Sequence, residues 1–502
     1  MPLNLPDVQL AAIAPEIALT VAALVLLVVD GFVGDRTTKW YLPALSTAGL
    51  LVAMFLAQRT WVDIGNDGPE LQLAGMAAVD RFSIFVKMAL AVFGILSVWL
   101  GREYLVKEHL EEAEYYGLVL FAVAGMMLMA TAADLIVMFI ALETFSVAVY
   151  VLVGFRRRSL ISQESAMKYF LLGAFSSAFF LLGIAFVYGA TGSTNLYGAP
   201  GSGTEAGIVQ YLTSTATTDV GFLLLAVAFL IIGLGFKVAA VPFHMWTPDA
   251  YQGAPSPVTG FMAAGTKLAA FAALLRLLDV SLFQLRADWR PIVIAIAVVT
   301  MIVGSILAVV QEDIKRLLAY SSIAHAGFVL TAIVAANDGG VSGALFYLAT
   351  YGLTIIGAFA VVTMVGGPHE RNVRLADYRG LFYQRPLLAG ALTLFLLSLA
   401  GVPLTSGFIA KLVVFGPAID SGYTWLVVVG MIASAIAAFF YLRIMVVMYM
   451  QEPDEGSATP RFGAVASSVV AVTGVATIVL GLAWSPLFEI AERATIYFFA
   501  GP

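Results

Sequence analysis

The sequence predicts an all-α protein that crosses a membrane about fourteen times. Of its 502 residues, 61% are hydrophobic and only 12% are charged, and the mean hydropathy is +0.95. Soluble domains carry about a quarter charged residues. Apolar runs of about 20 residues, which is enough for a helix to cross a ~30 Å hydrocarbon core, recur from one end of the chain to the other.

These apolar runs place the predicted helices, with boundaries good to a few residues. The predicted helices cover residues 10–31, 41–57, 77–100, 115–131, 133–154, 165–190, 219–243, 255–278, 289–310, 317–336, 341–365, 387–414, 422–449 and 463–486. The first run follows a start without Lys or Arg. It therefore reads as a mature helix and not as a secretory signal peptide.

Lys and Arg in the connections predict the orientation, because their excess marks the cytoplasmic side of a membrane protein. If the N-terminus lies outside, one side collects sixteen of these residues and the other side collects five. Those five are Arg59, Arg276, Arg286, Arg290 and Arg493. We therefore expect both termini on the periplasmic or outer side.

A weak internal repeat predicts the domain organisation. Residues 134–169 align with residues 313–347, at offsets of 179 and 178, and the Val-Pro pair at 241–242 echoes the pair at 402–403. Two related halves around a midplane pathway are typical of transporters. The predicted units are a three-helix segment at 1–114, five-helix repeats at 115–280 and 281–450, and a C-terminal helix at 451–502.

Four ionisable side chains fall at similar depth within predicted spans: Glu143 and Lys267 near the middle of their helices, Lys237 five residues before Pro242, and Lys411 after Pro403. A charge at the bilayer centre costs about 2.5–3.5 kcal/mol even on the lenient insertion scale, so unneeded charges are rare. One such lysine could be a structural partner or could snorkel to the interface, but four groups at similar depth indicate a pathway. If Glu143 lies near Lys237, moving the carboxylate away would favour release of a proton from the ammonium.

Two prolines predict interruptions of the seventh and twelfth helices. Pro242 and Pro403 are expected to break these helices near the middle of the bilayer, and each has glycines close by. Proline removes a backbone hydrogen bond, and the freed carbonyl is tolerated at membrane depth only against protein or water. A packing kink would explain one such proline, but two at repeat-related places indicate a hydrated interior.

Two of the four histidines lie at or near membrane depth. His325 and, less directly, His244 are candidate proton relays, because imidazole titrates near neutral pH. Axial haem ligation is the alternative, but the sequence has no paired histidines at membrane depth. Asp80, Arg81 and Lys87, at the start of the third run, are expected to form an interfacial cluster.

Several classes of chemistry are excluded. The chain has no cysteine, which rules out disulfides, thiolate-bound iron–sulfur clusters and cysteine metal sites within it. No basic tract indicates nucleic acid as a partner. We expect no metal or cofactor in this chain, and the lipid bilayer as its surroundings.

The chain resembles the antiporter-like membrane subunits of respiratory complex I, the proton-pumping NADH:quinone oxidoreductase, and the related Mrp cation/proton antiporters. The most specific stretch is FKVAAVPFHMWTPDAYQGAPSPVTGFMAAGTKLAAF at residues 236–271, supported by LETFSVAVYVL at 142–152 and SSIAHAGF at 321–328. The wording YQGAP at 251–255, together with Lys411, is similar to the subunit N branch, the homologue of mitochondrial subunit 2. The resemblance covers about residues 75–450.

The resemblance implies a role for each buried charge. The family's proton-translocating positions correspond to Glu143, Lys237, Lys267 and Lys411, with His325 and His244 along the axis between them. In the family the glutamate is proposed to tune the first lysine, the second lysine connects, and the third exchanges protons with the outer side. The family also implies discontinuous helices seven and twelve and two inverted five-helix repeats.

The resemblance further implies a multi-pass subunit of the bacterial plasma membrane. It would be a non-redox, proton-translocating part of an NADH:quinone oxidoreductase, a translocase driven by electron transfer from NADH to quinone. NADH, FMN, iron–sulfur clusters and quinone would be bound by other subunits. The implied partners are membrane-arm subunits, including the antiporter-like subunit M and small subunits such as K.

Two alternatives remain open at this point. A secondary antiporter of the Mrp type could use the same charges to exchange Na⁺ or K⁺ for H⁺. The stretch at 251–255 and Lys411 favour complex I over that function. A membrane scaffold without transport is the other alternative, and it predicts that Lys237→Ala leaves activity intact in the assembled complex.

Overall fold

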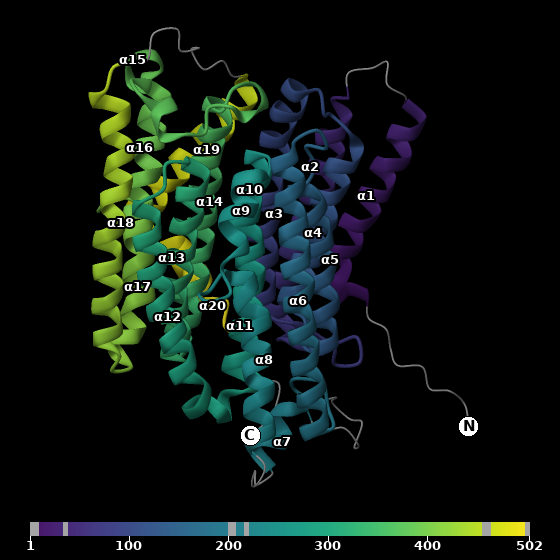
Figure 1. Cartoon of the computed structure of the whole chain (residues 1–502). Helices are drawn as coiled ribbons and strands as arrows, with labels where there is room; N and C mark the ends of the chain where they lie inside the picture. Colours follow the sequence, from purple (N-terminus) through teal and green to yellow (C-terminus); the bar gives the residue numbers. More distant parts are fainter. Residues whose placement is uncertain (1–9, 34–38, 199–206, 215–219, 454–462, 497–502) are drawn as a thin grey trace.

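The computed structural model describes residues 10–33, 39–198, 207–214, 220–453 and 463–496 as a bundle of roughly parallel and antiparallel helices (Figure 1). Thirteen helices in this described part are long and apolar enough to cross a membrane. Two further helices of 15 residues each, α16 (Pro386–Ala400) and α17 (Ser406–Asp420), occupy the place of the predicted helix 387–414. The predicted all-α membrane fold is confirmed.

The N-terminal segment contains a small hairpin that the sequence did not indicate. Its elements are η1 (Leu10–Ile13), α1 (Ala14–Val33), α2 (Tyr41–Asp67), β1 (Glu70–Gln72), β2 (Ala77–Val79) and α3 (Arg81–Glu108). The strands β1 and β2 pair antiparallel. The hairpin leads into α3, whose first turn is capped by the carboxylate of Asp80 accepting from the Ser83 amide at 2.9 Å.

The expected interfacial cluster at the start of α3 is wrong for two of its three residues. Asp80 is 1% exposed and forms an ion pair of 2.9 Å with Arg276, which is fully buried. Lys87 is 1% exposed and lies 2.8 Å from Glu16 of α1. Both charges are buried because each has a partner from a distant helix, which the local sequence cannot reveal.

The next five predicted spans are divided into more elements than the sequence suggested. They are α4 (Ala113–Thr131), α5 (Leu135–Val153), α6 (Leu160–Thr191), α7 (Ile208–Ser214), α8 (Val220–Val238), α9 (Trp246–Gly253), α10 (Ser256–Phe261), η2 (Met262–Thr266), α11 (Lys267–Arg276) and η3 (Leu277–Ser281). The predicted helix 219–243 ends five residues early, at the break around Pro242. Segments η2 and η3 are π-helical, a geometry frequent at functional sites.

The remaining elements complete the bundle. They are η4 (Phe283–Leu285), α12 (Arg286–Val309), α13 (Ile314–Ala335), α14 (Asp338–Val365), η5 (Pro368–Glu370), η6 (Leu375–Tyr378), α15 (Leu381–Gln384), α16, α17, α18 (Thr424–Met450), α19 (Ala464–Leu482) and α20 (Ser485–Arg493). The break between α16 and α17 contains Pro403, as predicted.

Two matching backbone bridges support the internal repeat. Asp134 pairs with Asn195, and Asp313 pairs with Arg374, each antiparallel. The second bridge repeats the first at a spacing of 179 residues, from Asp134 to Asp313 and from Asn195 to Arg374. After the first bridge the chain enters α7 at the bottom of Figure 1, and after the second it reaches α15 at the top. This placement favours inverted halves, whereas the repeat boundaries stay a prediction.

The core lies in the middle of the bundle. The most apolar stretch of Ser256–Ser281 is entirely buried, and the corresponding stretch of α13 is 94% buried, against 33% for α1 and α19. The outer helices expose large apolar side chains, such as Phe32 and Leu387 at 88% and 90%. An apolar exterior around a closely packed centre suits a protein surrounded by lipid.

Candidate functional site

The break between α8 and α9 places Lys237 in the last turn of α8, one residue before the helix ends. Ala239 adopts a left-handed φ of +63°, so the chain leaves the helix directly after Val238. The Val241 amide donates to Thr300 Oγ1 of α12 at 2.9 Å, and Trp246 Nε1 donates to the Phe236 carbonyl at 2.8 Å. The backbone groups that the break frees are thus satisfied by protein.

Lys237 lies in a cage of aromatic side chains. Its ammonium donates to the Tyr150 hydroxyl at 3.1 Å. It also lies 4.9 Å and 5.3 Å from the ring centres of Tyr150 and Tyr169, and Phe145 and Phe236 complete the cage. Ring faces stabilise a desolvated cation, so the cage can hold the ammonium without an adjacent carboxylate.

Glu143 acts on Lys237 through space. No ion pair joins the two residues in the part of the chain that the structure describes, although the Glu143 charge interacts electrostatically with Lys237. Glu143 is half-buried, and its buried Oε1 atom has no hydrogen-bond partner among the residues that the structure describes. Tyr150 follows Glu143 by two helical turns on α5, so both side chains lie on the same face. The pair predicted from sequence is therefore separated, with Tyr150 at the lysine.

Lys267 follows the π-helical segment η2 directly. Its side chain is 3% exposed, and its ammonium donates to the Ser322 carbonyl of α13. The ring of Tyr351 lies 6.0 Å away. The Ser322 hydroxyl in turn lies 3.4 Å from the Tyr251 hydroxyl. The connecting lysine thus meets the second half of the protein at α13.

His325, on α13, lies between the phenol groups of Tyr347 on α14 and Tyr441 on α18. Its Nδ1 atom is hydrogen-bonded to the Tyr347 hydroxyl, and its Nε2 atom lies 3.2 Å from the Tyr441 hydroxyl. Tyr441 also hydrogen-bonds the Ser321 hydroxyl. The Tyr351 ring lies 5.0 Å from the imidazole and 6.0 Å from the Lys267 ammonium. The Phe328 ring lies 5.5 Å from the imidazole and 5.2 Å from the Lys411 ammonium. His325 therefore lies near both lysines, and its relay role stays a prediction.

His244 lies apart from this chain of contacts. It belongs to the break between α8 and α9 and is half-buried. Its Nδ1 atom is buried and has no hydrogen-bond partner within the described residues. The structure therefore does not bring it together with the other predicted site residues, and its relay role stays a prediction.

Lys411 caps the broken helix α16. Gly401 ends that helix with a φ of +86°, and the Lys411 ammonium donates to the Leu399 and Ala400 carbonyls at 3.2 and 2.7 Å. It also donates to Ser434 Oγ of α18 at 2.5 Å. A cation at a helix C-terminus is favoured by the free carbonyls and by the helix dipole.

The charged series runs across the bundle. In Figure 1, α5 lies to the right, α8 and α11 lie centrally, and α13 and α17 lie to the left. Glu143, Lys237, Lys267 and Lys411 belong to α5, α8, α11 and α17. The four residues therefore come from helices that lie across the width of the bundle and not from any one helix.

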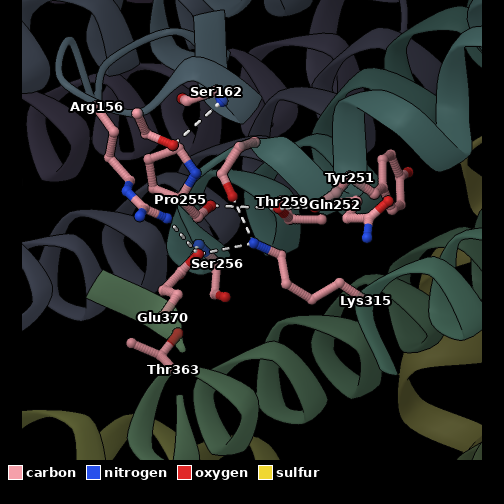
Figure 2. A network of polar contacts seen from close by, with 12 residues as sticks. Arg156, Ser162, Tyr251, Gln252, Pro255, Ser256, Thr259, Lys315, Thr363 and Glu370 are labelled. Atoms are coloured by element: carbon pink, nitrogen blue, oxygen red, sulfur yellow. Dashed lines mark hydrogen bonds and ion pairs between the residues drawn. The ribbon is translucent and has the colours of Figure 1, made fainter. Parts of the chain in front are cut away.

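A second charged cluster at one end of the bundle centres on Glu370 (Figure 2). Lys315 Nζ lies 2.9 Å and Arg156 Nη1 lies 3.2 Å from the same carboxylate oxygen. The other oxygen accepts the Ser256 amide, at the start of α10, at 2.7 Å. Burial alone would raise the pKa of Glu370, but Lys315, Ser256 and Arg156 together lower it below its usual value.

Lys315, one of the sixteen basic residues predicted on the cytoplasmic side, is buried within this cluster. Its side chain is 1% exposed and also donates to the Ala254 carbonyl at 2.5 Å. His369 and Glu370 both have a left-handed φ, at +57° and +49°. Such residues carry strain of about 1–3 kcal/mol each and persist only where the surroundings hold them.

Sequence reasoning missed the hydroxyl groups that contact the lysines and the histidine. The missed residues are Tyr150, Tyr441 and Ser434, and the ring of Tyr351 beside Lys267 was missed as well. Tyr150 had a usable signal, because it lies seven residues after Glu143 on one predicted helix. For the others, which come from helices distant in sequence, the local pattern carries no signal.

Comparison with known proteins gives a consistent result. Residues 132–437 match the family described as NADH:quinone oxidoreductase/Mrp antiporter, TM. NADH-quinone oxidoreductase subunit N of Chloroflexus aggregans is 42% identical over 497 residues, covering 98% of this chain and 99% of the relative.

Solved structures agree with this result. A chain of respiratory complex I from Thermus thermophilus has a TM-score of 0.79 and 35% identity, covering 95% of this chain and 99% of that one. A chain of the Mrp complex from Dietzia sp. DQ12-45-1b has a TM-score of 0.81 at 23% identity, covering 97% of each chain. The latter likeness concerns the fold alone.

Proposed function

The chain belongs to the NADH:quinone oxidoreductase/Mrp antiporter membrane family, and on that premise we propose that it is a proton-translocating membrane subunit of NADH:quinone oxidoreductase, of the subunit N type. The observation that carries the proposal is the series of three buried lysines across the bundle, each held by oxygen atoms of the protein. Such charges are too costly at membrane depth to be kept for packing.

The proposed mechanism begins at Lys237. The cage and the Tyr150 hydroxyl hold its ammonium, and the Glu143 charge adds stabilisation from a distance. A displacement of Glu143 away from Lys237 removes that stabilisation and favours transfer of the proton onward. Because Glu143 makes no short contact with Lys237, it can move without breaking an ion pair.

The onward route leads through Lys267 and His325 to Lys411, the proposed exchange site with the outer side. Each proton moved against 100 mV requires ~2.3 kcal/mol, so the route must respond to a signal from neighbouring subunits. We propose that NADH, FMN, iron–sulfur clusters and quinone are bound by those other subunits. The lack of cysteine in this chain supports that division for the clusters.

We further propose that the chain contacts membrane-arm neighbours such as subunits M and K and that both termini face the outer side of the plasma membrane. Exchange of Na⁺ or K⁺, as in an Mrp-type antiporter, is the weaker candidate. The relative from Chloroflexus aggregans, named subunit N, is 42% identical over 98% of this chain, whereas the Mrp chain is 23% identical.

The test is proton pumping by the intact complex in vesicles. Glu143→Gln and Lys237→Ala should each lower the ratio of protons pumped to NADH oxidised while the complex still assembles. The matched controls Glu164→Gln and Lys107→Ala change exposed residues outside the series and should keep the normal ratio. Unchanged pumping in both test variants would overturn the proposal, and a requirement for Na⁺ would favour the antiporter.

A further inference from the structure

Helix α18 presents two hydroxyl groups to the charged series, although it carries none of the four charges. Ser434 and Tyr441 are seven residues apart, which is about two helical turns, so they share one face. Ser434 contacts Lys411, and Tyr441 contacts His325. This face of α18 therefore lines the section of the series between His325 and Lys411.

A direct hydrogen bond between His325 and Lys411 is not formed. The ring centre of Phe328 lies 5.5 Å from that of His325 and 5.2 Å from the Lys411 ammonium. An ammonium group has three N–H donors. Those of Lys411 donate to the Leu399 carbonyl, the Ala400 carbonyl and Ser434 Oγ. The apolar ring of Phe328 therefore lies close to both the imidazole and the Lys411 ammonium. The imidazole makes its hydrogen bonds with the hydroxyls of Tyr347 and Tyr441 instead.

The hydroxyls around His325 form a continuous chain. Tyr347 bonds Nδ1, Tyr441 bonds Nε2, and Ser321 bonds Tyr441. A neutral imidazole has one donor and one acceptor nitrogen, so one phenol donates to the ring while the other accepts from it. The chain therefore has a direction, and passing one proton along it reverses that direction.

We propose that Tyr441 is a proton-relay residue in the section between Lys267 and Lys411. Its hydroxyl accepts a proton from His325 Nε2 while its own proton passes to the Ser321 oxygen, and Ser321 gives its original hydroxyl proton to water. His325 Nδ1 takes a replacement proton from Tyr347, which is reprotonated from water, so one proton enters at Tyr347, one leaves at Ser321 and every residue of the chain ends neutral. The reverse transfer works in the same way. Ser321 precedes Ser322, whose carbonyl binds Lys267, which brings the relay to the connecting lysine.

This inference rests on the proposed proton-translocating function. The test is Tyr441→Phe, which removes one oxygen and keeps the ring, measured as protons pumped per NADH oxidised by the intact complex. We expect a lower ratio. Tyr449→Phe is the matched control, because Tyr449 lies on the same helix and its hydroxyl accepts from Thr393 at 3.1 Å; it should pump normally.

A second measurement covers the case in which Tyr441→Phe fails to assemble. A fluorinated tyrosine at position 441 keeps the shape but has a more acidic hydroxyl, and it should shift the pH profile of pumping. A normal ratio in Tyr441→Phe, or an unshifted profile with the fluorinated residue, overturns the relay. If Lys237→Ala lowers pumping in the same assay, only the relay has failed; if Lys237→Ala also pumps normally, the proposed function has failed.

Discussion

At the scale of single residues, the position of Tyr150 is the feature on which the Lys237 site depends. Its hydroxyl takes the place beside the ammonium that the sequence suggested for Glu143. The ring of Tyr150 also packs edge-on against Tyr169, with centres 4.6 Å apart. A neutral hydroxyl leaves the distant carboxylate free to vary its influence, which a direct ion pair would not allow.

Gly173 of α6 provides the space for this hydroxyl. A Cβ atom at Gly173 would lie 1.9 Å from the Tyr150 oxygen, so Gly173→Ala must displace the phenol from Lys237. Overpacking of this kind costs about 1–3 kcal/mol. We expect lower proton pumping per NADH oxidised and a lower unfolding temperature of the complex.

Gly189 on the same helix is the control for that change. A Cβ atom there meets nothing within 4 Å, so Gly189→Ala should leave pumping unchanged. If Gly173→Ala and Gly189→Ala pump equally well, the position of the Tyr150 hydroxyl does not matter for transport.

The buried carboxylate of Glu370 predicts a pH dependence of stability. Its pKa in the folded protein is lowered, because Lys315, Ser256 and Arg156 outweigh burial. A lowered pKa contributes stability above the pKa of the unfolded chain, about 4.3, and this contribution is lost as the pH falls through the folded value. Glu370→Gln should therefore destabilise the protein at neutral pH, by about 3–5 kcal/mol for a broken buried ion pair.

Thermal unfolding of the complex across pH checks this expectation. The difference between the unaltered protein and Glu370→Gln should be largest near neutral pH and should shrink below about pH 4. Glu164→Gln removes an exposed carboxylate paired with Lys168 and should have little effect, because solvent screens that pair. A pH-independent difference for Glu370→Gln would show that its charge is not the cause.

At the scale of elements, the two helix breaks were predictable, but the groups that stabilise them were not. Pro242 and Pro403 indicated where α8 and α16 are interrupted, because proline cannot continue the backbone hydrogen bonds. The sequence did not indicate that Thr300 of α12 would bind the first break or that Lys411 would cap the second. Both are contacts between separate helices, which periodicity within one helix does not encode.

Thr300→Val tests the importance of the first break. The Val241 amide would lose its acceptor in a buried place, which costs about 1–3 kcal/mol, and Lys237 would lose its fixed position. We expect a lower unfolding temperature and faster hydrogen exchange at residues 239–245. Thr331→Val is the control, because that buried hydroxyl donates only to the Gly327 carbonyl within its own helix; equal effects of the two changes would refute the role of Thr300.

At the scale of the whole molecule, composition was sufficient for the fold class, and the four charges at membrane depth predicted a candidate site whose role stays a prediction. The sequence did not indicate which residue of a distant helix would contact each predicted site residue. Nothing in the sequence indicated that Lys315 would be buried beside Glu370. His325 was predicted to be a relay, but its partner Tyr441 comes from 116 residues further along the chain.

The repeat illustrates the same division. Similar residues 179 positions apart suggested two related halves. The two bridges at Asp134 and Asp313 then appeared at that spacing in the folded chain. The arrangement of the halves places Lys267, at the end of the first, against α13 of the second. The proposed path thus depends on packing between the predicted halves.

The central claim is that buried charges of this chain carry protons across the membrane, and Lys267 tests it most directly because it joins the two halves. The measurement is the ratio of protons pumped to NADH oxidised by the complex in sealed vesicles, with Lys267→Met compared with Lys107→Met at an exposed site. We predict an assembled complex with a reduced ratio for Lys267→Met and a normal ratio for the control. An assembled Lys267→Met complex that pumps with the normal ratio would contradict the account.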